Sequence, residues 1–346
     1  MNSGRSAYVV SLLSLAIFAA CAKKEKPLPG RVYTGIAFGK PYIIDVVGDS
    51  TDFRAQIDSI IHIFEMNFNV NDPQSTISRY NAFQRTDTVF AFNDSTGAFG
   101  IVYDLTRDLN ANTMQYYDPT VNPLKREWMI TKMGGLLEPN LDSLYKFVGF
   151  DGAKMDLTEL EDGKYGYKES YLRKADPRLE ADFTTVAAAV AFDNIADWLK
   201  MKQVAQFRIK YGHGVIAHGF AVDTLNVIPL GIFSDSSDQR IRLQNGAFSY
   251  KNAEDKILLV DPTYGYPVEN EMVYVAASAP SLAEAEVFSE AFMTMGFEKA
   301  ADYYTKNDES RIQSFMFYTD QKVLRNASTE GFDVMIIAPD STAEHN

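Results

Sequence analysis

The sequence predicts an α+β fold in which mixed sheets pack against helices. Apolar residues with a helical period alternate along the chain with β-rich runs, and glycine-containing turns between several of these runs indicate hairpins. Beyond residue 31 the chain has roughly 315 residues, with 23 Phe and 19 Tyr in the whole sequence, which is enough for a large core in one domain or two fused lobes.

The first half of the chain supplies a hairpin and two helices. The expected elements are a hairpin over Val32–Val47 that turns at Gly39-Lys40-Pro41, a helix over Thr51–Asn67, a short turn over Ser75–Asn81 and a helix over Thr96–Asn112. In the first helix Phe53, Ile57 and Ile60 follow the helical period and predict a buried face. Two prolines in residues 116–124 predict extended or turn backbone there.

The second half predicts most of the sheet. The expected elements are a short helix, a turn and a strand within residues 141–160, a helix over Val186–Lys200, strands over Phe207–Ile216, Val222–Phe233, Lys256–Val260 and Met272–Ala279, a helix over Pro280–Met295, and strands over Ser314–Thr319 and Val334–Ala338. Gly212-His213-Gly214 breaks the first of these strands. Thr184 or Thr185 is expected to cap the helix at 186–200.

The N-terminus is typical of an export signal, which we assign to residues 1–20. Arg5 gives the positive charge, and an apolar run ends in Ala19 and Ala20 directly before Cys21. Cys21 is the only cysteine of the chain, so an intrachain disulfide is impossible. Its position resembles the lipobox of bacterial lipoproteins, which implies acylation of Cys21 and anchoring to a membrane. The alternative is an ordinary signal peptide with a chance cysteine.

Residues 21–31 are charged and contain two prolines and a glycine, which indicates a tether between the anchor and a folded domain at 32–340. Ala22 after the cysteine fits an outer-membrane lipoprotein facing the periplasm. Removing residues 1–20 takes away only Arg5, so the formal charge of −13 becomes −14. Such an acidic protein repels nucleic acid, so we expect no nucleic-acid partner.

Residues 182–193, DFTTVAAAVAFD, lie where a strand is expected to lead into a helix, a place where proteins often bind phosphate. A phosphate-binding turn needs glycines for close approach of the backbone and a cation for charge. This segment has threonines and alanines instead. It therefore indicates a ligand site from which the phosphate-binding chemistry has been removed.

Five segments in order resemble the FAD:protein FMN transferase family, also called ApbE, over about residues 33–333. The segments are FEMNFNVNDPQSTISRYN at 64–81, YYDPTVNPL at 116–124, the helix start at 182–199, LLVDPTYGYPV at 258–268 and AEVFSEAFMTMG at 285–296. They are similar to the family patterns FS-Y-x-S-IS-x-N, FDPTVGPL, D-x-G-A-I-A-K-G-Y-A-V-D, H-I-x-D-P-x-T-G-x-P-V and A-D-A-L-x-T-A-L-F-V-x-G.

The resemblance implies a T-fold-related α+β architecture and a lipoprotein enzyme. Members of the family hydrolyse FAD at its pyrophosphate and attach FMN to a threonine or serine hydroxyl of a partner protein, using magnesium. The family's cofactor-binding positions map onto Asp118, Thr120, Thr184, Thr185, Ala187, Ala188, Asp261 and Gly265.

The departures from the family patterns fall on its working residues. Where the family has a lysine and a glycine, this chain has Ala188 and Ala189. The family's catalytic histidine corresponds to Leu258, which cannot accept a proton from a hydroxyl group. The threonine of the TG pair corresponds to Tyr264, and the GG pair to Gly212-His213-Gly214.

The family's metal-binding aspartate and threonine correspond to Glu286 and Glu290. Four residues apart, these carboxylates share one helix face and could bind Mg²⁺ through oxygen ligands. The alternative, which the spacing favours, is a solvated acidic face opposite the apolar stripe of the helix. His213 and His218 are candidates for a replacement base, although ordinary turn and strand roles fit their positions better.

These observations leave two hypotheses for function. The first, which the combined losses favour, is a catalytically impaired member that acts as a binding or scaffold domain in the envelope, with a protein partner there. The alternative is an active magnesium-dependent transferase whose site has been rewired. An unrelated hydrolase is disfavoured, because the sequence contains neither a G-x-S-x-G motif nor a zinc motif.

Overall fold

The computed structural model describes most of the predicted domain. The described residues are 30–134, 137–162, 167–220, 224–226, 238–243, 245–307, 310–332 and 334–337. The predicted signal segment, Cys21 and the tether up to residue 29 lie outside these ranges. Gly30 and Arg31, which were expected in the tether, form the start of the first strand.

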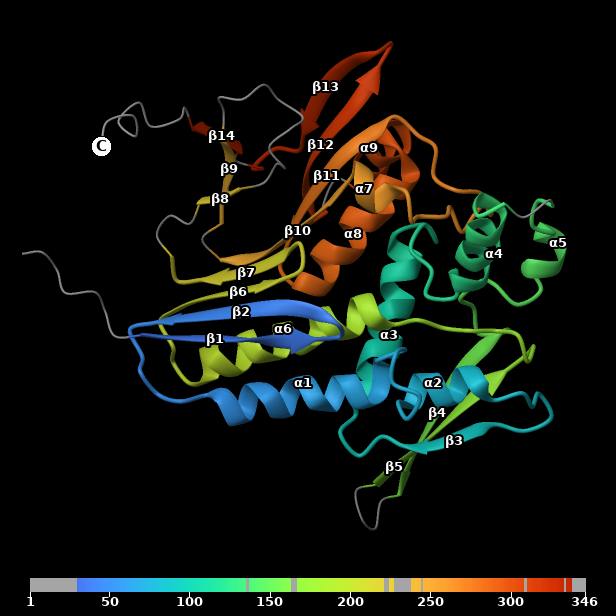
Figure 1. The fold of residues 1–346 in the computed structure, drawn as a ribbon. Helices are drawn as coiled ribbons and strands as arrows, with labels where there is room; N and C mark the ends of the chain where they lie inside the picture. The colour runs from blue at the N-terminus through green and yellow to red at the C-terminus, as the bar shows by residue number, and fades with distance from the viewer. Residues whose placement is uncertain are drawn as a thin grey trace, which may run out of the picture.

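An eight-stranded antiparallel sheet is the largest element of the fold (Figure 1). Its strand order is β1-β2-β6-β7-β10-β11-β12-β13. The strands are β1 (Gly30–Ala37), β2 (Lys40–Val47), β6 (Gln206–Tyr211), β7 (Gly214–His218), β10 (Gly246–Asn252), β11 (Met272–Ala279), β12 (Gln313–Asp320) and β13 (Val323–Ser328). Each neighbouring pair is antiparallel, so short turns can connect β1 to β2, β6 to β7 and β12 to β13.

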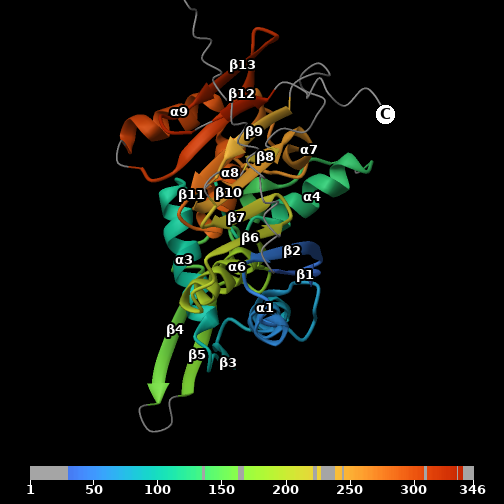
Figure 2. The same ribbon diagram turned by 90° about the vertical axis from the view of Figure 1, so that its left-hand side faces the viewer.

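Two smaller sheets accompany the large one among the described residues. One has the order β3-β5-β4 and the other β14-β9-β8. Their strands are β3 (Phe90–Asn93), β4 (Met155–Asp162), β5 (Tyr167–Lys174), β8 (Thr224–Asn226), β9 (Asp238–Arg242) and β14 (Val334–Ile337). Figure 2 shows β4 and β5 projecting away from the large sheet.

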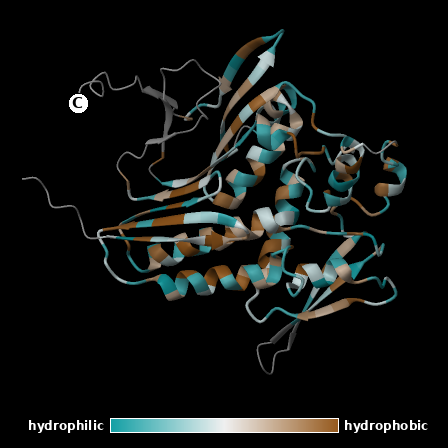
Figure 3. Cartoon of the chain, in the orientation of Figure 1, coloured by the Kyte–Doolittle hydropathy of each residue, from teal (hydrophilic) through white to brown (hydrophobic). Residues whose placement is uncertain are grey.

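Helices form two layers on one face of the large sheet. α6 (Thr184–Met201) and α8 (Leu282–Met295) contact each other, and α8 packs on β10 and β11. α1 (Arg54–Phe68) packs on α6 from the side away from the sheet (Figure 1). Figure 3 shows apolar and polar residues alternating around α1, as expected of a helix with one buried face.

The remaining helices are shorter or lie at the ends of this arrangement. They are α2 (Thr76–Ala82), α3 (Ala98–Asn112), α4 (Asn122–Lys132), α5 (Leu141–Leu144), α7 (Ala253–Lys256) and α9 (Phe297–Lys306). None of the described helices has both the length and the apolar character that crossing a membrane requires.

A group of phenylalanines joins the helices at the centre of the core. The Phe68 and Phe99 rings stack at 4.8 Å, and Phe183, just before α6, lies 6.2 Å from Phe99 and 5.6 Å from Phe150. Burying each ring contributes about 1.5–3 kcal/mol. This cluster fixes the start of α6 relative to the helices α1 and α3.

Most predicted elements are confirmed to within three residues at either end. Three predictions are corrected, at residues 75–81, 116–124 and 256–260. The 75–81 turn is the helix α2, which Ser75 caps by accepting a hydrogen bond from the Ser78 amide. α4 begins inside the segment expected to be extended, because its proline occupies the first turn, where no amide hydrogen is needed. Of the strand expected over 222–233, only 224–226 lies in the described residues.

The third correction concerns residues 256–260, which were expected to form a buried strand. Lys256 ends the helix α7, and the next two side chains, Ile257 and Leu258, are 67% and 65% exposed. Val260 makes only an isolated bridge to Pro267. The prediction of a buried strand is therefore wrong. The first apolar residues of this run line a surface pocket, which is described below.

Candidate functional site

The start of α6 is held by a carboxylate that precedes the predicted caps. Asp182 accepts a hydrogen bond from the Thr184 amide at 2.9 Å and another from the Asn122 side chain at 3.1 Å. Thr184 lies within the helix, where its hydroxyl donates to the Phe68 carbonyl at 3.3 Å. The Thr185 hydroxyl lies against the buried Tyr117 phenol. The prediction that either threonine caps this helix is therefore wrong.

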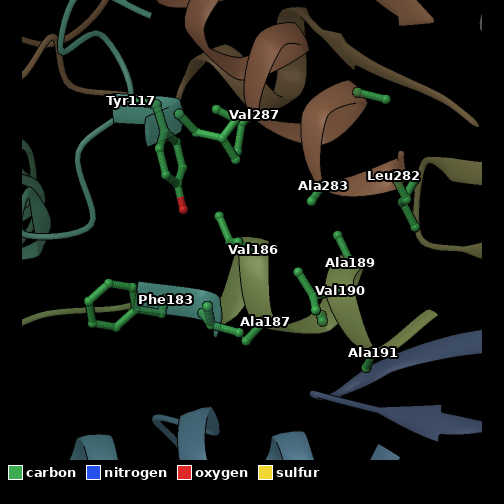
Figure 4. Packing of buried hydrophobic residues seen from close by; sticks show 14 of the residues in the cluster. Tyr117, Phe183, Val186, Ala187, Ala189, Val190, Ala191, Leu282, Ala283 and Val287 are labelled. Carbon is green, nitrogen blue, oxygen red and sulfur yellow. The ribbon is translucent and has the colours of Figure 1, made fainter. Parts of the chain in front are cut away.

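The alanines of the same segment are buried in the core. Ala187, Ala188 and Ala189 are at most 1% exposed. Figure 4 shows Ala189 and Ala283 between α6 and α8, where small side chains allow the helices to approach. No open surface remains at these positions for a phosphate group, so the structure does not support a ligand-binding role for Ala187 or Ala188.

Asp118 and Thr120 form a buried hydrogen-bonded turn. One oxygen of the Asp118 carboxylate accepts bonds from the Thr120 amide and hydroxyl, both at 2.6 Å, and the other accepts the Phe150 amide at 3.1 Å. The Thr120 hydroxyl also accepts the Gly149 amide at 2.7 Å. Burial raises the pKa of Asp118, although these donors oppose the increase. Both side chains are therefore structural in this arrangement, since their hydrogen bonds are made within the protein.

The segment around Asp261 forms a tight turn beside α4. Asp261 accepts bonds from the Thr263 amide at 2.8 Å and the Thr263 hydroxyl at 2.6 Å. Gly265 has a positive φ of 78°, and its carbonyl accepts the Trp128 indole hydrogen at 2.6 Å. An added Cβ at Gly265 would lie 2.9 Å from Leu141, so glycine is required for both space and conformation.

A pocket of about 580 Å³ opens between α4 and residues 257–267. Its lining combines apolar and basic side chains and is made by Asn122, Lys125, Arg126, Trp128, Met129, Lys132, Glu180, Ile257, Leu258, Leu259, Val260 and Pro267. Arg126 is paired with Glu180 at 2.8 Å, whereas no ion pair is recorded for Lys125 or Lys132 among the described residues. Leu258, where the resemblance places the family's histidine, thus faces a pocket suited to an anion with an aromatic or apolar part.

Glu286 lies in a buried ion pair with Lys251. The Lys251 ammonium donates to Glu286 Oε2 at 2.9 Å, and the two side chains are only 12% and 9% exposed. Burial by itself would raise the pKa of Glu286, but the Lys251 ammonium holds it below its usual value. The expectation of a solvated acidic face is therefore wrong for Glu286. Glu290, one turn later, is partly exposed and also interacts electrostatically with Lys251.

The two candidate histidines lie outside the pocket. His213, in the turn between β6 and β7, stacks on Tyr250 at 4.3 Å, and its Nδ1 lies 3.4 Å from the Asp255 carboxylate. His218, the last residue of β7, packs against the Phe207 ring at 5.1 Å. Neither histidine lines the surface around Leu258. The structure thus gives His213 a carboxylate partner and His218 a packing contact.

A further carboxylate connects α6 to α8. Asp193 accepts hydrogen bonds from the Leu282 and Ala283 amides at 2.8 and 3.1 Å, and so satisfies the start of α8. Burial raises the pKa of Asp193 to about 7, and the neighbouring Asp197 and Glu284 carboxylates add to the increase. The geometry of the helix pair therefore depends partly on this side chain.

Comparison with known proteins identifies the family of this chain. The family model described as the ApbE family matches residues 38–315. The chain belongs to the ApbE family. A curated relative from Vibrio cholerae named FAD:protein FMN transferase is 25% identical over 84% of this chain and 88% of its own length. One from Haemophilus influenzae with the same name is 20% identical over 87% and 90%.

Solved ApbE structures have the same fold. The flavin transferase ApbE from Vibrio cholerae matches with a TM-score of 0.68 at 19% identity, covering 88% of this chain and 99% of that one. The apo flavinyl transferase ApbE from Pseudomonas stutzeri also gives 0.68, at 18% identity, covering 88% and 96%. The predicted α+β, ApbE-like fold is therefore confirmed.

The metal site expected from the ApbE resemblance does not fit the described residues. No group of three or more histidine, cysteine, aspartate or glutamate side chains in the described part of the chain could hold a metal ion. Glu286 already binds an ammonium group, and Glu290 alone is too few ligands for Mg²⁺.

Sequence reasoning missed Lys251 and the basic side chains of α4. Lys251 shares one face of β10 with the buried residues Ala247 and Ser249, so strand alternation places it toward the helices. A lysine at such a position signals a buried acidic partner. The pocket had a signal too, because Lys125, Arg126 and Lys132 cluster beside the DPTVNPL motif that was already singled out.

Proposed function

We propose that this protein is an ApbE-family domain that binds a flavin nucleotide but has lost most of the FMN-transfer chemistry. The pocket between α4 and residues 257–267 supports the binding part of this proposal. Its volume lies in the range typical of small-molecule sites, about 300–1,000 Å³. Lys125 and Lys132 can attract phosphates, while Trp128, Met129 and Ile257 offer apolar surface to an aromatic ring system.

Leu258 is the observation that carries the loss of chemistry. Its side chain is 65% exposed at the pocket, at the position that the family resemblance gives to a catalytic histidine. A leucine cannot take the proton from an acceptor hydroxyl, and general-base catalysis contributes roughly 10²–10⁴-fold in rate. The buried pair Lys251–Glu286, at the family's metal position, supports the same conclusion.

A second candidate function is an active transferase with a rewired base. The contact between His213 and Asp255 favours it, because a carboxylate can orient an imidazole and stabilise its protonated form. His213 is partly exposed and could therefore reach a substrate hydroxyl. Its position outside the pocket that contains Leu258 counts against this role.

Flavin binding is tested by fluorescence. The chain has two tryptophans, of which Trp128 lines the pocket and Trp198 packs on Phe53 between α1 and α6. FAD should quench the fluorescence of the wild-type protein and of Trp198→Phe, and quench Trp128→Phe much less. Equal quenching of the two variants would place flavin elsewhere or show non-specific quenching.

Transfer is tested separately by incubation with FAD, Mg²⁺ and a threonine-containing acceptor peptide, with an active ApbE transferase as positive control. We expect no mass increase of the peptide from FMN addition. Transfer that disappears in His213→Ala would establish the second candidate instead. Transfer that survives in His213→Ala would contradict both the proposed loss of transfer and the assignment of His213 as the base.

The proposal includes anchoring in the cell envelope through Cys21. An acylated cysteine would hold the domain at a membrane and bring it close to an envelope partner protein. The test is fractionation of cells that express the full chain or Cys21→Ala. The full chain should sediment with membranes and Cys21→Ala should not, whereas equal membrane association would exclude lipidation at this residue.

A further inference from the structure

The surroundings of Glu286 contain two cations that come from separate strands. Lys251 reaches Glu286 from β10, and Lys40, at the start of β2, acts on it electrostatically from a more exposed position. Glu290 supplies a second carboxylate from the same helix. The Asp255 carboxylate also acts electrostatically on Lys251 and lies 3.4 Å from His213 Nδ1, so Lys251 interacts with three carboxylates.

We propose that the Lys251 ammonium occupies the position that a divalent metal ion takes in the ApbE family, so that no such ion binds at Glu286 and Glu290. In this arrangement the cation is part of the polypeptide. The positive charge beside the helix α8 is then retained whatever the concentration of magnesium.

The geometry leaves a metal ion no free access to Glu286. Lys251 occupies Oε2 at 2.9 Å. On the other side, a methyl group added at Gly214 would fall 2.9 Å from Oε1, so the turn between β6 and β7 lies close to that oxygen. Mg²⁺ needs oxygen ligands at about 2.0–2.1 Å in near-octahedral geometry. It would therefore have to displace the ammonium group.

The charges around Glu286 also disfavour binding of a metal ion. A site for a divalent cation gains affinity from uncompensated carboxylates. Here each carboxylate lies beside a lysine, and among the described residues no third acidic side chain joins the pair to make a metal-binding group. Removing Lys251 would leave two carboxylates on one helix face and create the attraction that the native chain lacks.

The inference rests on the membership of this chain in the ApbE family but not on flavin binding. Failure of FAD to bind would leave the ammonium in place, and metal binding at Glu286 would leave the flavin pocket intact. The two proposals can therefore fail separately.

Binding of Mn²⁺ provides the test, because this ion takes the same oxygen ligands as Mg²⁺ and its free form is measured by electron paramagnetic resonance. The proteins compared are the purified wild-type domain, Lys251→Ala, Glu286→Gln and the matched control Lys322→Met, which removes an exposed lysine. Circular dichroism establishes that each variant is folded.

We expect that wild type and Lys322→Met bind no Mn²⁺ that depends on Glu286, and that Lys251→Ala binds the ion about tenfold or more tightly than wild type. Wild-type binding that is lost in Glu286→Gln would overturn the proposal. A folded Lys251→Ala with no gain in affinity would also overturn it, because Lys251 would then not be what excludes the metal. If Lys251→Ala does not fold, Lys251→Gln takes its place.

Discussion

Replacing Lys251 with methionine should lower the free energy of unfolding by about 3–5 kcal/mol, because it leaves a buried carboxylate without its cation. The partners are in contact at 2.9 Å, and their side chains are only 12% and 9% exposed. Methionine keeps most of the aliphatic stem of lysine, so little packing is lost. The loss therefore reports on the electrostatic pair and not on a cavity.

The pH dependence gives this prediction a second readout. Despite burial, the Lys251 ammonium lowers the pKa of Glu286, so in the wild type the pair's stabilisation is present above the usual glutamate pKa and is lost as the pH falls. In Lys251→Met, Lys40 and Ser249 still favour the ionised carboxylate, but burial, the largest influence, is no longer offset by Lys251, so the pKa of Glu286 rises. The variant should therefore be least impaired near pH 4 and lose stability as the pH rises toward 7.

The double variant Lys251→Met/Glu286→Met separates desolvation from contact loss. Well-packed apolar pairs often match or exceed the stability of a buried ion pair, by up to about 1–4 kcal/mol. We expect the double variant to be at least as stable as wild type and clearly more stable than Lys251→Met. Urea unfolding followed by circular dichroism at several pH values measures all three proteins, with Lys322→Met as the control.

Two results would refute this reasoning. A loss below about 1 kcal/mol in Lys251→Met would mean that water solvates Glu286 and that the pair has the small value of a surface ion pair. A double variant no more stable than Lys251→Met would mean that the lysine contributes through packing. In either case the ammonium would not be the required partner of the carboxylate.

Three further predictions concern other parts of the site. Gly214→Ala should destabilise the fold by about 1–3 kcal/mol, because its Cβ would lie 2.6 Å from Leu282 Cδ1 and 2.9 Å from Glu286 Oε1, and a thermal melt will check this. Asp193→Asn should gain stability relative to wild type as the pH rises from 5 to 8, because the pKa of Asp193 is raised to about 7 and its ionisation in the folded state is unfavourable; unchanged relative stability would contradict this. Asp118→Asn should cost about 1–3 kcal/mol in urea unfolding, because an amide cannot accept the bonds that both oxygens now receive, and a wild-type-like midpoint would show that Thr120 and its neighbours rearrange freely.

The sequence predicted the helices of the core well because their apolar period reflects burial directly. At the start of α1 and within it, Phe53, Ile57 and Ile60 were assigned to the buried face and are at most 9% exposed. The ends of α6 and α8 were predicted within two residues for the same reason. The α9 helix was not predicted, although Phe297 at its start stacks on Tyr318 at 3.7 Å and fixes it to the sheet. The helix also carries a local signal that sequence reasoning missed, because Phe297, Ala300 and Tyr303 follow the helical period.

Local sequence patterns gave a wrong prediction where apolar residues line a surface pocket instead of the core. Ile257 and Leu258 have the composition of a buried strand, yet they line a pocket beside α4. Binding surfaces for aromatic ligands use the same residue types as a core, so composition cannot separate the two. The DPTYGYPV motif that follows was the better guide, since the turn at Asp261 and the positive φ of Gly265 match it.

The candidate metal site shows what residue spacing alone can predict and what it cannot. Four-residue spacing placed Glu286 and Glu290 on one helix face, but their partner Lys251 comes from a strand 35 residues earlier in the chain than Glu286. An ion pair across such a separation depends on how the helix lies on the sheet. Only strand alternation around Lys251 carried a local signal for it.

The substitutions away from the family pattern are consistent with one another in energetic terms. Ala188 is 1% exposed in the core, where a lysine would need a buried anion. The buried carboxylate of Glu286 on α8 is already paired with Lys251. Restoring a lysine at 188 would therefore add an unpaired charge and excess volume together. For the same reason, returning this chain to the family's chemistry requires changing Ala188, Lys251 and Leu258 together, because each single reversal leaves a charge or a base without its partner.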